Sequence, residues 1–370
     1  MKKIIFAFVA MLLLVSMAIA GNKNEKKLFA DKQIKKTMLK ALNWQLKHPK
    51  HQLYDWTNGA FYAGVFAAYE TTGSPKVWDA LIEMGEANEW KPGPRLKHAD
   101  DHVICQTYID MYRLTRDKKM IGPFAETMVK FKETPFQAEG IQKITWWWCD
   151  ALFMAPAAYV KLGVTLKEDD YLEMTDKLWK ECYDLLWDED NHLYARDLSY
   201  VWTADNQDPK KEANGEKIFW SRGNAWVIGG LVRILKELPQ DYPNRDFYIQ
   251  NYKEMAARIV ELQQEDGLWR ASLLDPDSYP GGEASGSGFY TYALAWGINN
   301  GILDSETYLP VVKKAWIGLN GLIQKDDRVG WCQPIGADPR KNFSNESWEV
   351  FGTGAFLLAG SEVIKLKLKQ

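Results

Sequence analysis

The run Asn58-Gly59-Ala60-Phe61-Tyr62-Ala63-Gly64-Val65 decides the fold class of this chain, because it lies in a helix-length segment that has one charged residue, Glu70 near its end, and no continuous polar face. A helix that is apolar on every side must be buried on every side. The segment around it spans 57–72, and five others share its small, apolar and aromatic character: 99–115, 146–162, 223–237, 286–300 and 347–365. The sequence therefore predicts six inner helices.

Six amphipathic segments alternate with the inner ones along the chain. Apolar residues recur at helical spacing in them, charged residues follow one face, and no run of residues alternates convincingly as a strand would. Their spans are 31–47, 75–90, 117–133, 167–187, 245–265 and 305–325. Six inner helices surrounded by six outer ones predict an all-α fold, an (α/α)6 barrel of six helical hairpins. A superhelical stack of helix pairs is the alternative, since hairpins alone do not specify closure.

The amino-acid composition limits the classes of function that the chain can have. The chain has 370 residues, with 46 Lys plus Arg against 49 Asp plus Glu and a net charge of −3. Without a basic run, the sequence predicts no nucleic-acid binding. The aromatic content is high, with 17 Trp, 17 Tyr and 15 Phe, and suits stacking against sugar rings as well as core packing. The four cysteines lack close pair spacing, and we expect them to be buried free thiols.

The N-terminus is typical of an export signal. Lys2 and Lys3 precede an apolar run, and Ala18-Ile19-Ala20 supplies a small-x-small cleavage pattern before Gly21. We therefore expect residues 1–20 to be a signal peptide, residues 21–370 to form a single domain, and the protein to be periplasmic or secreted. The apolar run is short for a membrane span, and no later run approaches about 20 apolar residues, so no membrane insertion is expected.

Two carboxylate positions lie where inner helices should begin. Asp100 and Asp101 follow His98, and Asp150 follows Trp146-Trp147-Trp148-Cys149. An Asp at such a position is commonly only a helix cap. Asp150, however, has apolar neighbours one helical turn away, where a carboxylate without a function would be costly. Because inner helices of a barrel start at the same end, these carboxylates are expected to meet at one mouth.

A second group of candidates is Trp220-Ser221-Arg222-Gly223-Asn224-Ala225-Trp226. Arg222 among indoles fits a ligand carboxylate in a partly dry site, and it fits a buried pair with a protein carboxylate equally well. The spacing of His98 and His102 is a weak zinc signal without the His-Glu-x-x-His order, so no metal is expected.

Several motifs together resemble the unsaturated rhamnogalacturonyl hydrolases, glycoside hydrolase family 105, and the related unsaturated glucuronyl hydrolases of family 88. In chain order the motifs are Ala99-Asp100-Asp101, Trp148 to Met154, Trp220 to Trp226, and Ser285 to Ile298. The resemblance implies a six-hairpin barrel that removes a terminal 4,5-unsaturated galacturonic or related uronic acid from lyase-generated pectin and rhamnogalacturonan oligosaccharides by hydrating the C4–C5 double bond, with no cofactor.

By this resemblance Asp150 matches the catalytic Asp, and Asp101 matches the second carboxylate, with Asp100 as the less favoured choice. The substrate-binding candidates are Asp100, Trp147, Arg196, Trp220, Arg222 and Trp226. Arg196 stands where many members of the family carry a His.

Two other functions remain open from the sequence. The barrel could be a conventional two-carboxylate glycosidase of saturated glycans, or a non-catalytic protein that binds a glycan on its aromatic rim. An oligosaccharide is the partner in each case, and the sequence leaves the oligomeric state open.

Overall fold

The computed structural model describes residues 26–203 and 210–367, so the predicted signal peptide lies outside the described residues. The inner helices begin with α3 and end with α14. Their bounds are α3 Trp56–Thr72, α5 Ile104–Thr115, α7 Ala151–Met154, α8 Pro156–Leu166, α10 Ser221–Leu235, α12 Ala284–Asn299 and α14 Val350–Val363. The outer helices are α2 Asp31–Lys47, α4 Pro75–Ala87, α6 Gly122–Glu133, α9 Asp170–Leu186, α11 Arg245–Glu261 and α13 Ser305–Gly321.

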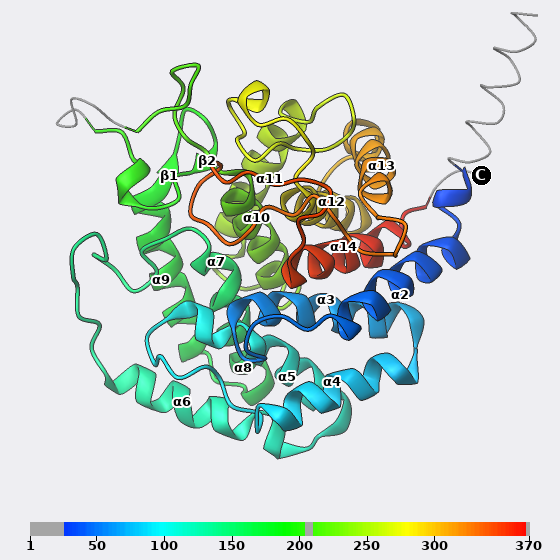
Figure 1. Cartoon of the computed structure of the whole chain (residues 1–370). Helices are drawn as coiled ribbons and strands as arrows, with labels where there is room; N and C mark the ends of the chain where they lie inside the picture. The colour runs from blue at the N-terminus through cyan, green and yellow to red at the C-terminus, as the bar shows by residue number, and fades with distance from the viewer. Residues whose placement is uncertain (1–25, 204–209, 368–370) are drawn as a thin grey trace, which may run out of the picture.

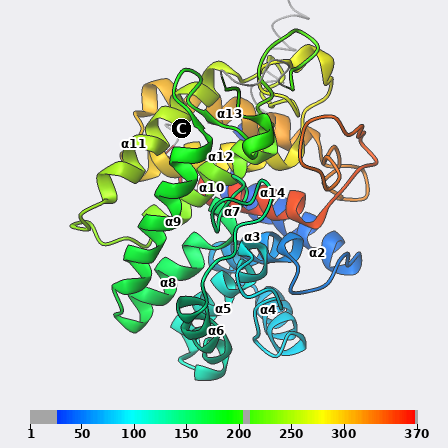
Figure 2. The same cartoon turned by 90° about the vertical axis from the view of Figure 1, so that its left-hand side faces the viewer.

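The inner helices form a closed ring. In order, α3 packs on α5, α5 on α8, α8 and α7 on α10, α10 on α12, α12 on α14, and α14 returns to α3. Figure 1 shows this ring near the centre of the molecule, with α4, α6, α9 and α13 outside it. The same pairing of inner and outer helices is seen from the side in Figure 2. The prediction of an (α/α)6 barrel is confirmed, and the superhelical alternative is wrong because α14 packs on α3.

Closure depends on glycine. A Cβ atom placed on Gly354 of α14 would lie 2.7 Å from the carbonyl oxygen of Ala60 and 2.7 Å from the Cα of Phe61, both in α3. A Cβ on Gly64 would overlap the Gly354 carbonyl in turn. The two backbones can approach this closely only because neither glycine carries a side chain.

Two inner segments differ from their predicted bounds. The segment 146–162 is helical only from Ala151 and is interrupted at Ala155, because Pro156 lacks an amide hydrogen and its ring excludes a continuous helix. The segment 99–115 begins with the 3₁₀ turn η1, Ala99–His102, before α5. Similarly, 117–133 begins with the 3₁₀ turn η2, Lys118–Met120, and becomes α-helical at Gly122. The first two irregularities lie at the candidate carboxylates: Asp150 directly precedes α7, and Asp100 lies in η1.

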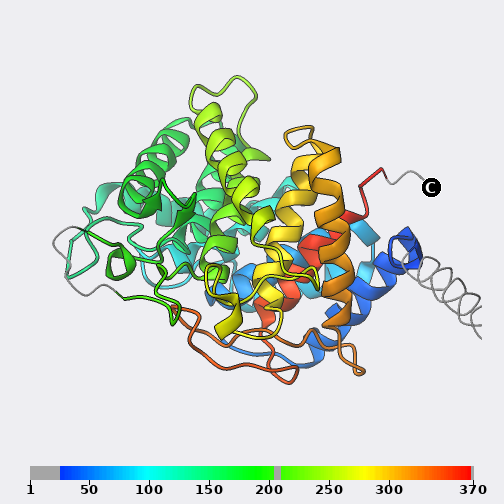
Figure 3. The same ribbon diagram turned by 90° about the horizontal axis from the view of Figure 1, so that it is seen from above.

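The two ends of the barrel are unequal. The chain leaves the inner helices through connections of a few residues, as at 73–74, 167–169 and 300–304, and it enters them through long loops, as at 134–150, 187–220 and 322–349. In Figure 3 the loop before α14 lies along the lower edge and the short connections lie at the upper edge. The long loops hold two short strands, β1 Trp187–Asp188 and β2 Leu193–Tyr194, and the 3₁₀ turns η3 Leu198–Tyr200 and η4 Pro276–Ser278. We call the long-loop end the mouth and the other end the base.

Aromatic side chains fill the barrel axis. Phe153, Trp226 and Phe289 pack with ring centroids 4.5–5.1 Å apart, and all three are fully buried. All four cysteines are free and buried, as predicted. No helix in the part of the chain that the structure describes is both long enough and apolar enough to span a bilayer.

Candidate active site

Acidic residues stand at the start of most inner helices, so the mouth carries a ring of carboxylates. Three of them are satisfied by local partners. Asp55 accepts a hydrogen bond from the Thr57 amide, at 2.9 Å, and Glu283 accepts from the amides of the first turn of α12. Glu349 pairs with Lys50 at 2.7 Å and with His51 at 2.8 Å. These three carboxylates are caps or ion-pair partners.

Asp150 precedes α7 but makes no such cap. Its Oδ2 atom lies 3.5 Å from the Cys149 thiol and 3.7 Å from the Nε of Arg196, and 12% of its side chain is exposed. Burial raises the pKa of Asp150, while the charges of Arg196 and Arg222 oppose this rise. The result is a carboxyl group in an apolar wall that retains access to the mouth.

Asp100 faces the same space. Its side chain is 17% exposed, and its Oδ2 atom lies 3.6 Å from the Nδ1 of His98. Burial, and next the negative charge of Asp150, raises the pKa of Asp100 to about 8. Burial lowers the pKa of His98 to about 4, so this imidazole is neutral at pH 7 and adds no positive charge. Asp100 and Asp150 therefore form a coupled pair that holds a proton at neutral pH.

Asp101 has a different environment from the one its sequence position suggested. Its Oδ2 accepts from the Arg95 amide at 2.5 Å, its Oδ1 accepts from the Arg95 Nε at 3.0 Å, and the residue is 4% exposed. The Asp101 carbonyl also accepts from the Gly93 amide. Because both carboxylate oxygens already hold the 93–95 loop, the preference for Asp101 over Asp100 is revised, and we assign the second carboxylate of the site to Asp100.

Arg196 and Trp147 line the mouth beside Asp150. The guanidinium lies 5.4 Å from the centre of the Trp147 ring, and its Nη1 donates to Asp197 at 2.6 Å. Its Nε is buried without a hydrogen-bond partner among the described residues and points toward Asp150. Trp147 is partly exposed. Of the predicted substrate-binding residues, these two and Asp100 keep surface that a ligand can touch.

Trp220 and Arg222 are occupied by the protein itself. Trp220 donates to the Gln333 side chain at 2.8 Å, and Arg222 donates to the Gln333 and Pro334 carbonyls at 2.6 and 2.9 Å. Arg222 has no exposed surface and lies 4.0 Å from Glu283. The sequence predicted that Trp220 and Arg222 touch the substrate, but side chains this deeply buried have no surface for such a contact. Both residues instead fasten the 322–349 loop across the mouth.

Trp226 is likewise fully buried, with its ring against Phe153 and Phe289 in the barrel axis. Its prediction as a substrate contact is revised for the same reason: it packs beneath the mouth and presents no surface. The sequence pattern alone could not separate an indole in the axis from one on the rim, because both follow the start of an inner helix.

Sequence reasoning missed Asp197 and Gln333. Asp197 holds Arg196 and also caps η3 by accepting from the Ser199 amide at 2.8 Å. Gln333 joins Trp220 to the Asp338 carbonyl. Both residues lie in irregular loops, where no periodicity marks them; the only available signal for Asp197 was its position next to Arg196.

The described residues contain no group of three or more His, Cys, Asp or Glu side chains arranged to hold a metal ion. His102, one half of the weak zinc signal, is fully buried, and its Nδ1 is 2.7 Å from the Tyr159 hydroxyl. A helical barrel with a coupled pair of carboxyl groups, an arginine and an indole at its mouth has the chemistry of an enzyme that acts on acidic carbohydrates.

Comparison with known proteins agrees with that class. The family described as Glycosyl Hydrolase Family 88 matches residues 29–367. An unsaturated 3S-rhamnoglycuronyl hydrolase from Formosa agariphila is 44% identical over 374 residues, covering 97% of this chain and 99% of that protein. Among solved structures, a family 88 glycosyl hydrolase from Bacteroides vulgatus is 31% identical with a TM-score of 0.83, covering 91% of this chain and all of the other. A protein named as a polysaccharide lyase is 34% identical with the same TM-score, covering 92% and 99%.

This chain belongs to glycosyl hydrolase family 88, and it is a glycosidase. The likeness extends over nearly the whole described barrel, so it includes both the ring of helices and the loops that form the mouth.

Proposed function

We propose that this glycosidase removes a terminal 4,5-unsaturated uronic acid from oligosaccharides released by polysaccharide lyases. The observation that carries the proposal is the pair Asp100 and Asp150, two mouth carboxyl groups whose pKa values burial raises and whose nearest basic groups, at 3.6 and 3.7 Å, lie beyond close hydrogen-bond distance. The hydrolase name of the 44% identical relative supports the same substrate class.

The reaction starts from an enol ether, because the C4–C5 double bond is conjugated with the ring oxygen. A carboxyl proton adds to C4, the ring oxygen stabilises the cation at C5, and water adds at C5 while its proton returns to the carboxylate. The resulting hemiketal opens, and the aglycone leaves by rearrangement. The resemblance assigns proton delivery to Asp150, and burial favours the protonated form of this carboxyl group by raising its pKa.

Arg196 is suited to the uronate carboxylate. Its side chain is 19% exposed, with Nε 3.7 Å from Asp150 and the guanidinium carbon 5.4 Å from the centre of the Trp147 ring. A substrate carboxylate placed on it would put the uronide ring over the exposed part of the indole. Arg196, which stands where many members of the family carry a His, is therefore proposed to bind the uronate carboxylate.

The unsaturated sugar is the same whether it derives from glucuronic or from galacturonic acid. Introducing the double bond removes the stereocentres at C4 and C5, so glucuronic and galacturonic acid give the same terminal ring. Discrimination must then lie in the next sugar. The name of the relative from Formosa agariphila specifies a rhamnoglycuronyl substrate, and we propose rhamnose as the neighbouring sugar here as well.

Export to the periplasm or the medium belongs to the same proposal. It is supported by Lys2, Lys3 and the Ala18-Ile19-Ala20 pattern, and by a substrate class that arises where large polysaccharides are cleaved. We also propose that residues 21–370 act as one catalytic domain, because the family match and the ring of inner helices both extend over nearly that range.

The test follows the ultraviolet absorbance of the double bond. Lyase-generated disaccharides of unsaturated uronic acid on rhamnose, with and without a sulfate at rhamnose O3, should lose their absorbance with the protein, whereas polymeric substrate should gain none. Asp150→Asn should reduce the rate by about a thousandfold. The matched control is Asp304→Asn at the base of the barrel, since Asn retains the cap of α13 and Asp304 lies at the opposite end from the proposed site.

Three results would contradict the proposal. Absorbance that rises on intact polysaccharide would indicate a lyase, the activity named for one solved relative. Cleavage of saturated oligosaccharides alone would indicate a conventional glycosidase. Disaccharides that bind but remain intact would indicate a binding protein.

A further inference from the structure

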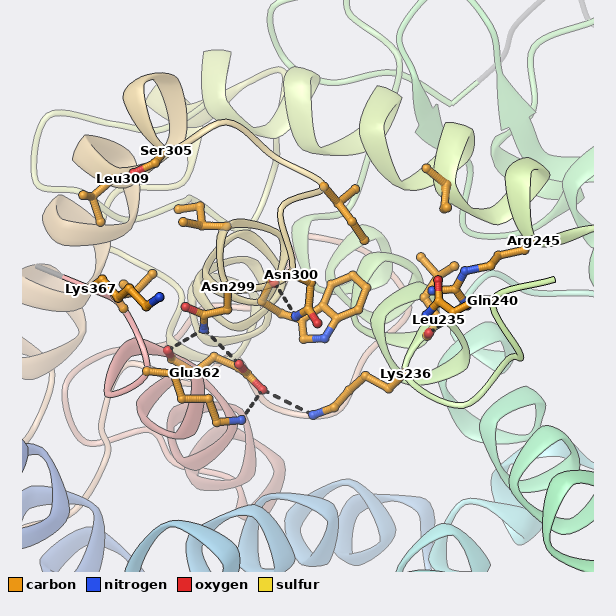
Figure 4. A pocket seen from close by; sticks show the side chains of 16 residues that line it. Leu235, Lys236, Gln240, Arg245, Asn299, Asn300, Ser305, Leu309, Glu362 and Lys367 are labelled. Carbon is orange, nitrogen blue, oxygen red and sulfur yellow. Dashed lines mark hydrogen bonds and ion pairs between the residues drawn. The ribbon is translucent and has the colours of Figure 1, made fainter. Parts of the chain in front are cut away.

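The base of the barrel, opposite the proposed active site, contains two adjoining cavities of about 800 and 700 Å³. Volumes of this size are typical of sites for small ligands. Lys236 and Lys365 line both cavities, and Glu362 lies between these two ammonium groups, at 3.2 and 2.9 Å. Figure 4 shows Glu362 in the larger cavity, linked to Lys236 and to Asn299.

The buried charged groups of the larger cavity already have partners among the described residues. Arg245, its most buried cation, donates to the Leu235 and Leu238 carbonyls at 3.1 and 2.8 Å. Glu362 already accepts from Lys236, Lys365 and Asn299. The smaller cavity differs in two respects, its charge and its unpaired donors.

Positive charge is in excess around the smaller cavity. The ion pairs of its wall join five cations to three carboxylates: Arg113, Lys161, Arg233, Lys236 and Lys365 with Asp110, Glu237 and Glu362. Three further charged residues line it: Glu70, which is exposed, and Asp31 and Lys35. Glu70 makes no ion pair within the described residues, although burial raises its pKa and the charges of Lys236 and Lys161 oppose this rise. With these three residues counted, six cations face five carboxylates, an excess of one positive charge.

Arg233 is the least compensated of the cations. It is 7% exposed, its Nε donates to the side chain of Gln106, and its closest carboxylate oxygen is Oδ2 of Asp110, 4.0 Å away, while Oδ1 of the same carboxylate pairs with Lys161. A buried guanidinium without a close counter-ion is costly. Its terminal nitrogens form the planar fork that matches an oxyanion.

Tyr292, a neighbour of Arg233, supplies a second observation. It lines the same cavity and is 1% exposed, and its hydroxyl has no hydrogen-bond partner among the described residues. The Lys236 ammonium is 5.9 Å from the centre of its ring. Basic residues at the ends of inner helices are explained by helix dipoles, but an unpaired hydroxyl in the middle of α12 is not.

We propose that the smaller cavity binds a small oxyanion, a carboxylate or a sulfate, through the guanidinium of Arg233 and the hydroxyl of Tyr292, with Lys236 nearby. The free ion and an acidic monosaccharide present the same group. A cavity of about 700 Å³ has room for either. This site is separate from the proposed active site, so it does not depend on the proposed function.

Isothermal titration of the full chain with sodium sulfate and with sodium glucuronate tests the site, against sodium chloride at matched ionic strength and neutral glucose. Saturable binding of at least one oxyanion is expected. Whichever of sulfate and glucuronate binds more tightly shows whether the natural ligand is a free ion or an acidic monosaccharide. Tyr292→Phe should weaken it about tenfold, the loss expected for a hydrogen bond to a charged group. Without ligand its melting temperature should stay within about 2 °C of the wild type, because the hydroxyl makes no hydrogen bond of normal geometry among the described residues and has only the Arg233 guanidinium nearby.

Arg233→Gln should weaken binding at least as much, and Lys35→Gln is the matched control for a charge lost at the edge of the cavity. The control should change affinity less than twofold. No saturable heat beyond that of chloride, or equal affinity in the wild type and Tyr292→Phe, overturns the proposal. Tyr292→Phe decides the question alone if Arg233→Gln does not fold.

Discussion

Asp100→Asn should make the protein more stable and the enzyme far less active. Asp100 is held in a buried position that raises its pKa from 3.8 to about 8, through desolvation and the charge of Asp150. In the unfolded chain the same carboxyl ionises near pH 4. Between these two pKa values the unfolded state releases a proton that the folded state retains, so the wild type loses stability as pH rises from about 4 to about 8.

The size of this effect follows from the pKa change. A rise of about 4 pKa units at about 1.4 kcal/mol each sets an upper limit of ~6 kcal/mol. Because the side chain keeps 17% exposure and shares its titration with Asp150, we expect about 2–3 kcal/mol in practice. An unfolding entropy of about 2.1 cal/mol/K per residue over ~340 residues converts this to about 3–4 °C in Tm.

The assay is thermal unfolding of wild type and Asp100→Asn from pH 4 to pH 9, combined with initial rates. The Tm difference should be near zero at pH 4, grow to about pH 8 and then level off. The alkaline limb of kcat/KM, expected near pH 8 in the wild type, should be lost with the carboxyl group. A Tm difference that is constant with pH, or a variant with normal turnover, would refute the coupled pair.

Three other perturbations test the structure. Arg196→Gln should raise the pKa of Asp150, because the positive charge that opposes its protonation is removed, and Arg196→Lys should restore most of the shift; an NMR titration of the Asp150 carboxyl carbon that Arg196→Gln leaves unchanged would contradict this. Gly354→Ala should cost about 1–3 kcal/mol by forcing α14 from α3, whereas Gly321→Ala, where a Cβ meets nothing within 4 Å, should be neutral or slightly stabilising; equal melting temperatures would count against the closure contact. The four cysteines should not react with a thiol reagent until the protein unfolds, because they are buried and burial raises the pKa of each thiol. Rapid labelling of the native protein would show that the barrel opens.

The helical character of the chain and the division into inner and outer helices were readable from the sequence. An inner helix such as α3 is apolar on all sides, and this pattern is local, so no knowledge of its partners is needed. The irregular starts at η1 and α7 were not readable, because they depend on Pro156 and on loop contacts that compete with helix formation.

The site was predictable in part. Asp150 and its apolar neighbours stand together in the sequence, and the structure places them at the mouth as expected. The choice between Asp100 and Asp101 was not available, since adjacent residues on a 3₁₀ turn point in different directions and only the Arg95 contact shows which carboxylate is used structurally. The burial of Arg222 likewise depends on carbonyl groups more than a hundred residues away.

The sequence by itself determined an all-α chain of hairpins with acidic and aromatic residues where inner helices begin, because helical periodicity and burial are written into neighbouring residues. Only the tertiary structure decided that the ring closes between α14 and α3, and which carboxyl groups face each other. Both outcomes depend on distances between segments far apart in the chain, and the pKa of a carboxyl group depends on those distances and on the solvent that they exclude.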